Sequence, residues 1–226
     1  GDDETNAIVD YRWQLVPINN SIAEPDRDLQ QYIEEFRGEV DRKYAVMVTK
    51  LSTRLTHPKR EEETTLGNLI ADALALNSES EVMLIGSGSI RVKELGPMVT
   101  LKDFLASFPY DDSIHRFEIT GAQLTKIFAH IMRPENRTGE GECYQVNRGL
   151  EAVYSDKEGK LASLKIRGKL VCNGSLYTIA MQGFHYNNAL AYLNISSEEL
   201  LDSGKHKVVT TSARDVLEEY LRTHQN

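Results

Sequence analysis

The sequence contains little cysteine and no long apolar stretch. The first absence excludes a disulfide-rich domain, and the second excludes a membrane-spanning helix. Only two of its 226 residues are cysteines, Cys143 and Cys172, which is too few for a domain held together by several disulfides. Whether these two cysteines pair is left open by the sequence. No stretch approaches the roughly 18 consecutive apolar residues of a membrane-spanning helix, so we expect no transmembrane segment.

Positive charge is also in short supply. The chain has 26 lysines and arginines against 34 aspartates and glutamates, which gives a formal net charge of -8. The strongest basic run, HPKR at residues 57–60, is followed at once by three glutamates. Because an acidic protein repels phosphodiester backbones, nucleic acid is not an expected partner.

Motifs that mark a self-contained catalytic centre are missing. The six histidines are scattered, and none has the HxH, HxxxH or HExxH spacing of a metal site. The chain contains no CxxC pair, no Walker loop, no GxGxxG fingerprint and no GxSxG nucleophile elbow. The sequence therefore reveals no catalytic centre of its own.

The first 44 residues are predicted to form a strand followed by a long helix. Residues 6–18 alternate between polar residues and the apolar set Val9, Tyr11, Trp13 and Leu15, which favours a strand. Helical spacing over residues 27–44 joins Leu29, Ile33, Phe36, Val40 and Tyr44. A strand with a single helix behind it is typical of an arm, so we predict one segment at residues 1–44 and a body at residues 45–226.

The body is predicted to mix helices with strands. Apolar periodicity and capping residues predict helices at residues 64–77, 100–108, 120–132, 196–204 and 212–224. Short apolar runs predict strands that include residues 81–86, 113–120, 175–184 and 206–212. The DKEGK turn at residues 156–160 is typical of a hairpin, so part of the sheet is antiparallel. We predict an α+β fold with a mixed sheet, hairpins and packed helices.

Three features favour ligand binding. In IGSGSIR, residues 85–91, the small residues Gly86 and Gly88 precede Arg91, whose guanidinium suits a carboxylate, a phosphate or a base edge. The alternative is a simple turn with a surface arginine. Tyr110 in FPYDD and Phe184 in MQGFHYNN are aromatic residues in predicted loops, and two such rings can clamp a planar ligand. The alternative is that they cover the edge of the core.

The order and wording of seven motifs resemble the C-terminal domain of the 5′-nucleotidase / UDP-sugar hydrolase family. The motifs are REEETTLGNLIADAL, IGSGSIR, FPYDD, ITGAQL, GECYQVNRGLEAVY, YTIAMQGF and TTSARDVLEEYL. The resemblance covers about residues 45–226. It implies that residues 7–44 are the end of the family's first domain and the helix that links the two domains.

The resemblance also implies a function. In that family an N-terminal metallophosphoesterase domain holds two metal ions, and the C-terminal domain grips the nucleoside part of the substrate. We therefore expect no cofactor in this chain, a metallophosphoesterase domain or subunit as its partner, and a nucleoside-like or nucleotide-like ligand. We do not expect hydrolysis by this chain alone. We expect an exported protein, periplasmic or at the cell surface, because the sequence starts without methionine as a trimmed chain would.

The candidate site residues follow position by position. Arg91 matches the family's substrate-contacting arginine, and Tyr110 and Phe184 match its two base-stacking phenylalanines. Gly86 and Gly88 belong to a turn that usually reads Asn or Ser followed by three glycines. Leu190 stands where the family has an aspartate that holds the ribose hydroxyls. Arg60 lies near the place of a second substrate arginine, with Glu62 closer in register.

Three interpretations remain open. The first, which we favour slightly, is that the chain is a substrate-recognition subunit of a split enzyme. The second is that it is the C-terminal part of a longer single-chain enzyme. The third interpretation is a non-enzymatic module, for small-molecule binding or for structure, that descends from such a domain.

Overall fold

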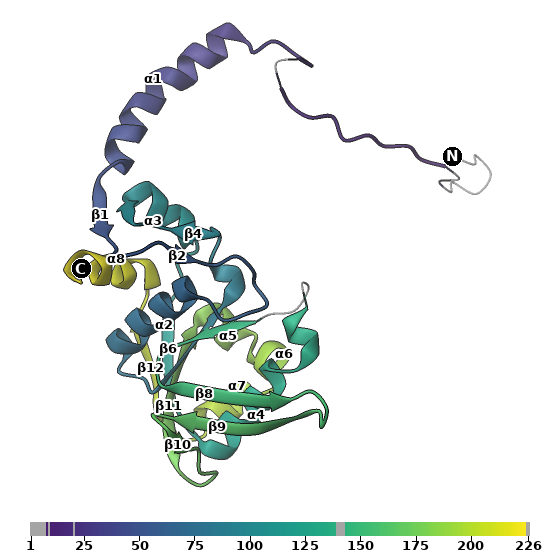
Figure 1. The fold of residues 1–226 in the computed structure, drawn as a ribbon, viewed down its shortest axis with the longest axis vertical. Coiled ribbons are helices and arrows are strands. Elements are labelled where there is room, and N and C mark those ends of the chain that lie inside the picture. Colours follow the sequence, from purple (N-terminus) through teal and green to yellow (C-terminus); the bar gives the residue numbers. More distant parts are fainter. Residues whose placement is uncertain (1–7, 9, 20, 139–142, 225–226) are drawn as a thin grey trace. The chain divides into compact units, whose positions relative to one another are not determined.

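The computed structural model describes residues 8, 10–19, 21–138 and 143–224 (Figure 1). The chain divides into two compact units, residues 1–44 and residues 45–226, which are described separately.

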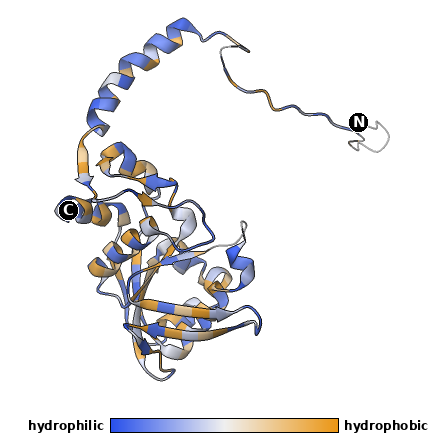
Figure 2. Cartoon of the chain, viewed as in Figure 1, coloured by the Kyte–Doolittle hydropathy of each residue, from blue (hydrophilic) through white to orange (hydrophobic). Residues whose placement is uncertain are grey.

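The first unit contains one long helix, α1 (Arg27–Tyr44), over the range that the sequence predicts. The helix begins after Asp26, because its Oδ1 accepts hydrogen bonds from the backbone N–H groups of Asp28 and Leu29, both at 3.0 Å. The helix is mostly hydrophilic with isolated apolar positions (Figure 2), and none of its residues is buried.

The predicted strand in residues 6–18 is wrong for every residue of that range that the structure describes. Residues 8 and 10–18 form no strand, and residues 6, 7 and 9 lie outside the described part. Tyr11 and Trp13 are 76% and 78% exposed. An alternating pattern shows which face a strand would bury but supplies no partner, and an isolated strand leaves its N–H and C=O groups unpaired.

The second unit confirms the predicted α+β fold. Its helices are α2 (Thr65–Ser78), α3 (Leu101–Ser107), α4 (Gly121–Ile131), α5 (Gly183–Asn187), α6 (Ala189–Leu193), α7 (Ser197–Leu201) and α8 (Ala213–Thr223). Its strands are β1 (Met47–Lys50), β2 (Leu55–Thr56), β3 (Val82–Gly86), β4 (Glu94–Leu95), β5 (Met98–Thr100), β6 (Ile114–Thr120), β7 (Tyr144–Val146), β8 (Leu150–Ser155), β9 (Lys160–Ile166), β10 (Lys169–Leu170), β11 (Leu176–Gln182) and β12 (His206–Thr210).

A five-stranded mixed sheet with the order β12-β6-β11-β3-β7 is the centre of this unit (Figure 1). Only its β11–β3 pair is parallel; the other three pairs are antiparallel. The predicted DKEGK hairpin joins β8 to β9 in a separate three-stranded sheet. Because β3 and β11 are parallel, their carboxyl ends lie at the same end of the sheet, and the segments that follow them leave the sheet there.

Both faces of the central sheet are covered, and β3 shows how. Its side chains alternate between two apolar clusters. Met83 and Ile85 pack with residues of α2 and α8, whereas Val82 and Leu84 pack with residues of α4. All four are fully buried, which explains why β3 reads as a continuous apolar run. Burial of each such side chain contributes about 1.5–3 kcal/mol.

Candidate ligand-binding site

A pocket of about 480 Å³ brings together most of the predicted site residues. Five of the six line it: Arg60, Gly88, Arg91, Tyr110 and Phe184. The other lining residues are Ser89, Asp111, Asp112, Gln182, His185, Asn187 and Tyr192. The sixth predicted residue, Gly86, does not line the pocket but ends β3 just before a 3₁₀ turn at Ser87–Ser89.

Arg91 is held at the pocket by the turn that precedes it. Its backbone N–H donates to the carbonyl oxygen of Ser107 at 2.9 Å, and its Nη1 donates to the carbonyl oxygen of Gly88 at 3.3 Å. The guanidinium carbon lies 5.7 Å from the centre of the Tyr110 ring. This distance allows a cation–π contact, so the arginine and the first aromatic residue form one surface.

Gly86 has an ordinary backbone conformation, with φ of -61°. Any residue adopts this value, so backbone geometry does not require glycine there. The turn is instead fixed through the buried Ser87, whose Oγ accepts a hydrogen bond from Gln145 Nε2 at 2.6 Å.

Gln145, on β7, links the turn to the segment that carries Arg60. Its Oε1 accepts from the N–H of Thr64 at 2.8 Å, and its Nε2 also donates to the carbonyl oxygen of Glu62 at 2.9 Å. The side chain is fully buried. Sequence reasoning missed this residue, because nothing in GECYQVN marks a glutamine that satisfies two distant segments.

The two predicted ring residues both line the pocket and are partly exposed. Tyr110 is 52% exposed and Phe184 is 53% exposed. Phe184 does not lie in a loop as predicted, but in the short helix α5, where its ring centre lies 5.6 Å from that of Tyr192. A five-residue helix is too short for apolar periodicity to reveal. Tyr186, by contrast, packs on Phe117 at 5.0 Å and covers the core.

His185 and Gln182 were not predicted as site residues, although they flank Phe184 in sequence. Burial lowers the pKa of His185 to about 4, against the opposing effect of the negative charge of Asp112. His185 is therefore neutral at pH 7. Gln182 is 2% exposed, and its Oε1 accepts a hydrogen bond from Ser89 Oγ at 2.9 Å. Both side chains give the pocket neutral polar groups.

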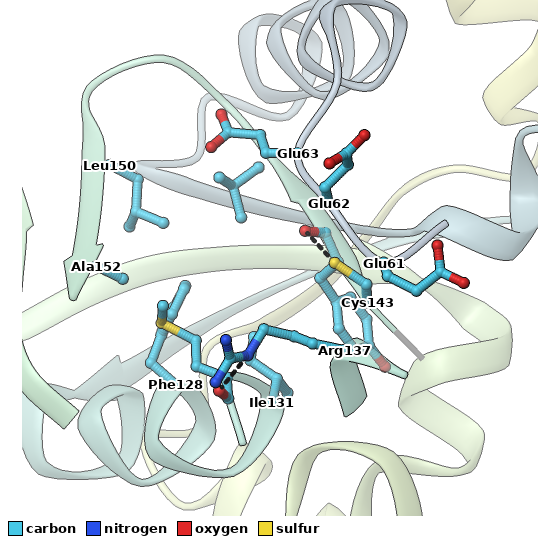
Figure 3. Close-up of a pocket in the computed structure, with 12 residues that line it drawn as sticks. Glu61, Glu62, Glu63, Phe128, Ile131, Arg137, Cys143, Leu150 and Ala152 are labelled. Atoms are coloured by element: carbon cyan, nitrogen blue, oxygen red, sulfur yellow. Dashed lines mark hydrogen bonds between the residues drawn. The ribbon is translucent and has the colours of Figure 1, made fainter. Parts of the chain in front are cut away.

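Glu62 lies at a different cavity, of about 330 Å³ (Figure 3). Three consecutive glutamates line it together with apolar residues of α4 and β8, including Phe128, Ile131, Leu150 and Ala152. Arg60 lies one position before the glutamates and lines the pocket of Arg91, Tyr110 and Phe184 instead. Leu190, on α6, lines neither cavity and is 66% exposed.

Within the described residues, no three His, Cys, Asp or Glu side chains are close enough to share a metal ion. Both cysteines belong to the described part, and no disulfide joins them. No helix there is long and apolar enough to cross a membrane.

Comparison with known proteins identifies the family. The model of the family described as 5′-nucleotidase, C-terminal domain, matches residues 44–193, which is more than half of the chain. A snake venom 5′-nucleotidase from Naja atra is 30% identical over 177 residues, which are 70% of this chain and 33% of the venom protein.

Solved structures share the fold. A 5′-nucleotidase precursor from Thermus thermophilus superposes with a TM-score of 0.64 at 17% identity, covering 86% of this chain and 39% of that one. The NAD nucleotidase of Haemophilus influenzae gives a TM-score of 0.65 at 13% identity, covering 89% and 39%. This chain spans 33% of the length of the venom protein and 39% of each of these two chains. As the resemblance of its motifs predicted, the chain belongs to the family of 5′-nucleotidase C-terminal domains.

Proposed function

We propose that this chain is the substrate-recognition domain or subunit of a 5′-nucleotidase-like phosphohydrolase that acts on nucleotides. The observation that supports it best is the convergence of Arg60, Arg91, Tyr110 and Phe184, which are far apart in sequence, on one pocket. Two exposed aromatic rings suit a nucleobase, and each stacking contact contributes about 1–3 kcal/mol. Two arginines in the same pocket suit an anionic group on the same ligand.

The metal chemistry in this proposal belongs to a metallophosphoesterase domain, either on another polypeptide or elsewhere in a longer chain. The described residues offer no metal-ligand cluster, and the relatives are longer proteins of which this chain spans only a part. We also propose that the protein is exported, periplasmic or at the cell surface, since one relative is a venom protein.

Calorimetric titration with adenosine tests the ring clamp. We expect binding by the unmodified protein and a loss of affinity of at least about tenfold in the Tyr110→Ala, Phe184→Ala double variant. The matched control is Tyr32→Ala, Phe36→Ala, which removes the same two residue types at 59% and 53% exposure from α1. Equal affinity in the clamp variant and the unmodified protein would refute the proposal.

The second candidate is a non-enzymatic module that binds another small molecule. It is favoured by Leu190, which cannot accept hydrogen bonds from ribose hydroxyls and does not line the pocket. Leu190→Asp separates the two functions. Tighter adenosine binding supports nucleoside recognition by a weakened site, whereas unchanged affinity together with tight binding of an unrelated metabolite supports the second function. Leu76→Asp, at a similar 63% exposure on α2, is the control.

A further inference from the structure

Asp112 joins the two segments that carry the proposed clamp rings. Its Oδ2 accepts a hydrogen bond from the backbone N–H of Phe184 at 2.8 Å. Its Oδ1 accepts one from the backbone N–H of Ser113 at 2.8 Å. Tyr110 lies two residues before this carboxylate, so one side chain connects the loop of the first ring to the helix of the second.

The contact between these segments is close on the backbone level too. The N–H of Gly183 donates to the carbonyl oxygen of Ser113 at 2.8 Å. A Cβ atom on Gly183 would lie 2.4 Å from Ser113 Oγ and 2.8 Å from Asp112 Oδ1, so a side chain there would displace one or both of these groups. The start of α5 therefore packs directly against residues 112 and 113.

The same residue is anchored from a third direction. The carbonyl oxygen of Asp112 accepts a hydrogen bond from the N–H of Ala213, the first residue of α8, at 2.8 Å. The neighbouring Asp111 has a different role, since its carboxylate pairs with Arg214 at 3.1 Å. Of the two adjacent aspartates, Asp112 is the one whose carboxylate accepts a hydrogen bond from the segment of the second ring. A carboxylate suits this place, because hydrogen bonds to a charged acceptor are stronger than neutral ones.

We propose that Asp112 is a positioning residue that holds the segments of Tyr110 and Phe184 in place relative to each other, and so supports the binding of a flat ring between them. This inference rests on the proposed function, because it concerns the geometry of the same clamp. Asp112 acts through Phe184 and need not touch the ligand itself.

Affinity for adenosine tests the inference in four proteins: unmodified, Asp112→Ala, Asp112→Asn and Asp103→Ala. We expect Asp112→Ala to weaken binding about tenfold, because the start of α5 loses its acceptor. Asp112→Asn keeps one acceptor oxygen and should bind with intermediate affinity. Asp103 also accepts a backbone N–H, from Thr100 at 3.0 Å, but lies away from the pocket, so its loss should change affinity less than about twofold.

A second variant separates positioning from general damage to the fold. In a Phe184→Ala background, Asp112→Ala should change affinity by less than about twofold, because no second ring remains to be placed. Proton NMR titration measures affinities into the millimolar range, and amide exchange at Phe184 should be faster in Asp112→Ala. A tenfold loss in the Phe184→Ala background, or no loss in the unmodified background, would overturn this inference alone. Failure of the unmodified protein to bind adenosine would overturn the proposed function and the inference with it.

Discussion

Gly67 is a residue whose identity follows from one neighbour. A Cβ atom at this position in α2 would lie 2.0 Å from Gln145 Oε1. Gln145 cannot move aside cheaply, because it is fully buried and bonded to Thr64 and Ser87. The glycine of the LGN motif is therefore required by close packing, and the packing supports both segments that flank the pocket.

Gly67→Ala should lower the free energy of unfolding by about 1–3 kcal/mol, because overpacking outweighs the better helix propensity of alanine. Urea denaturation measures the change. Gly38→Ala is the matched control in α1, where no atom lies within 4 Å of the added Cβ, and it should stabilise the helix by up to about 1 kcal/mol. A neutral or stabilising Gly67→Ala would contradict the packing argument.

At the scale of elements, the short helix α5 makes stability depend on pH. His185 is buried in it with its pKa lowered to about 4, while the unfolded chain titrates near 6.5. Between these values the unfolded state binds a proton that the native state does not, so acid favours unfolding. The stability is complete above pH 6.5 and decreases as the pH falls towards 4.

Lowering the pH from 7 to 5 should therefore cost about 2 kcal/mol of unfolding free energy through His185 alone. Chemical denaturation at both pH values measures this difference. The variant His185→Gln should show a smaller difference. Part of the dependence should remain, because burial also lowers the pKa of His57, His115 and His130. An equal pH dependence in both proteins would refute this assignment.

Helices whose first residues carry a capping motif were predictable from the sequence. Elements that depend on contacts with distant segments were not. Thr100 and Thr120 each form a capping box, with Asp103 and Gln123, so α3 and α4 begin where the sequence indicates. Residues 6–18 carry the alternating pattern of a strand, but those that the structure describes, 8 and 10–18, form no strand. The helices α5 and α6 have five residues each, fewer than two helical turns, so their apolar positions form no readable period.

At the scale of the whole molecule, the chain should bind without hydrolysing. We expect no phosphate release from AMP by the purified protein with added Mg²⁺, Mn²⁺, Co²⁺ or Zn²⁺, because activation of water needs several ligands around one ion. Phosphate release assays with a metallophosphoesterase as positive control measure this. Metal-dependent turnover that scales with the concentration of this chain and survives repurification would contradict the expectation.

The pocket was predictable only in part. Arg91, Tyr110 and Phe184 were predicted from the resemblance of their sequence motifs to those of a family. Such a resemblance can assign residues to one site even when they are far apart in sequence. Gln145, Gln182 and Asp112 were not predicted, because their importance comes from burial and from hydrogen bonds to distant segments. Such properties exist only after the chain has folded.

The shared direction of β3 and β11 has a consequence for how this domain can change. The turn with Arg91 follows β3 and the helix with Phe184 follows β11, so both pocket segments leave the sheet at one end. β3 is buried along its whole length and β11 from Ile179 to Gln182, so these strands contribute to the stability of the core. Substitutions in these short segments can therefore change which ligand the pocket binds, while the sheet and its core stay unchanged.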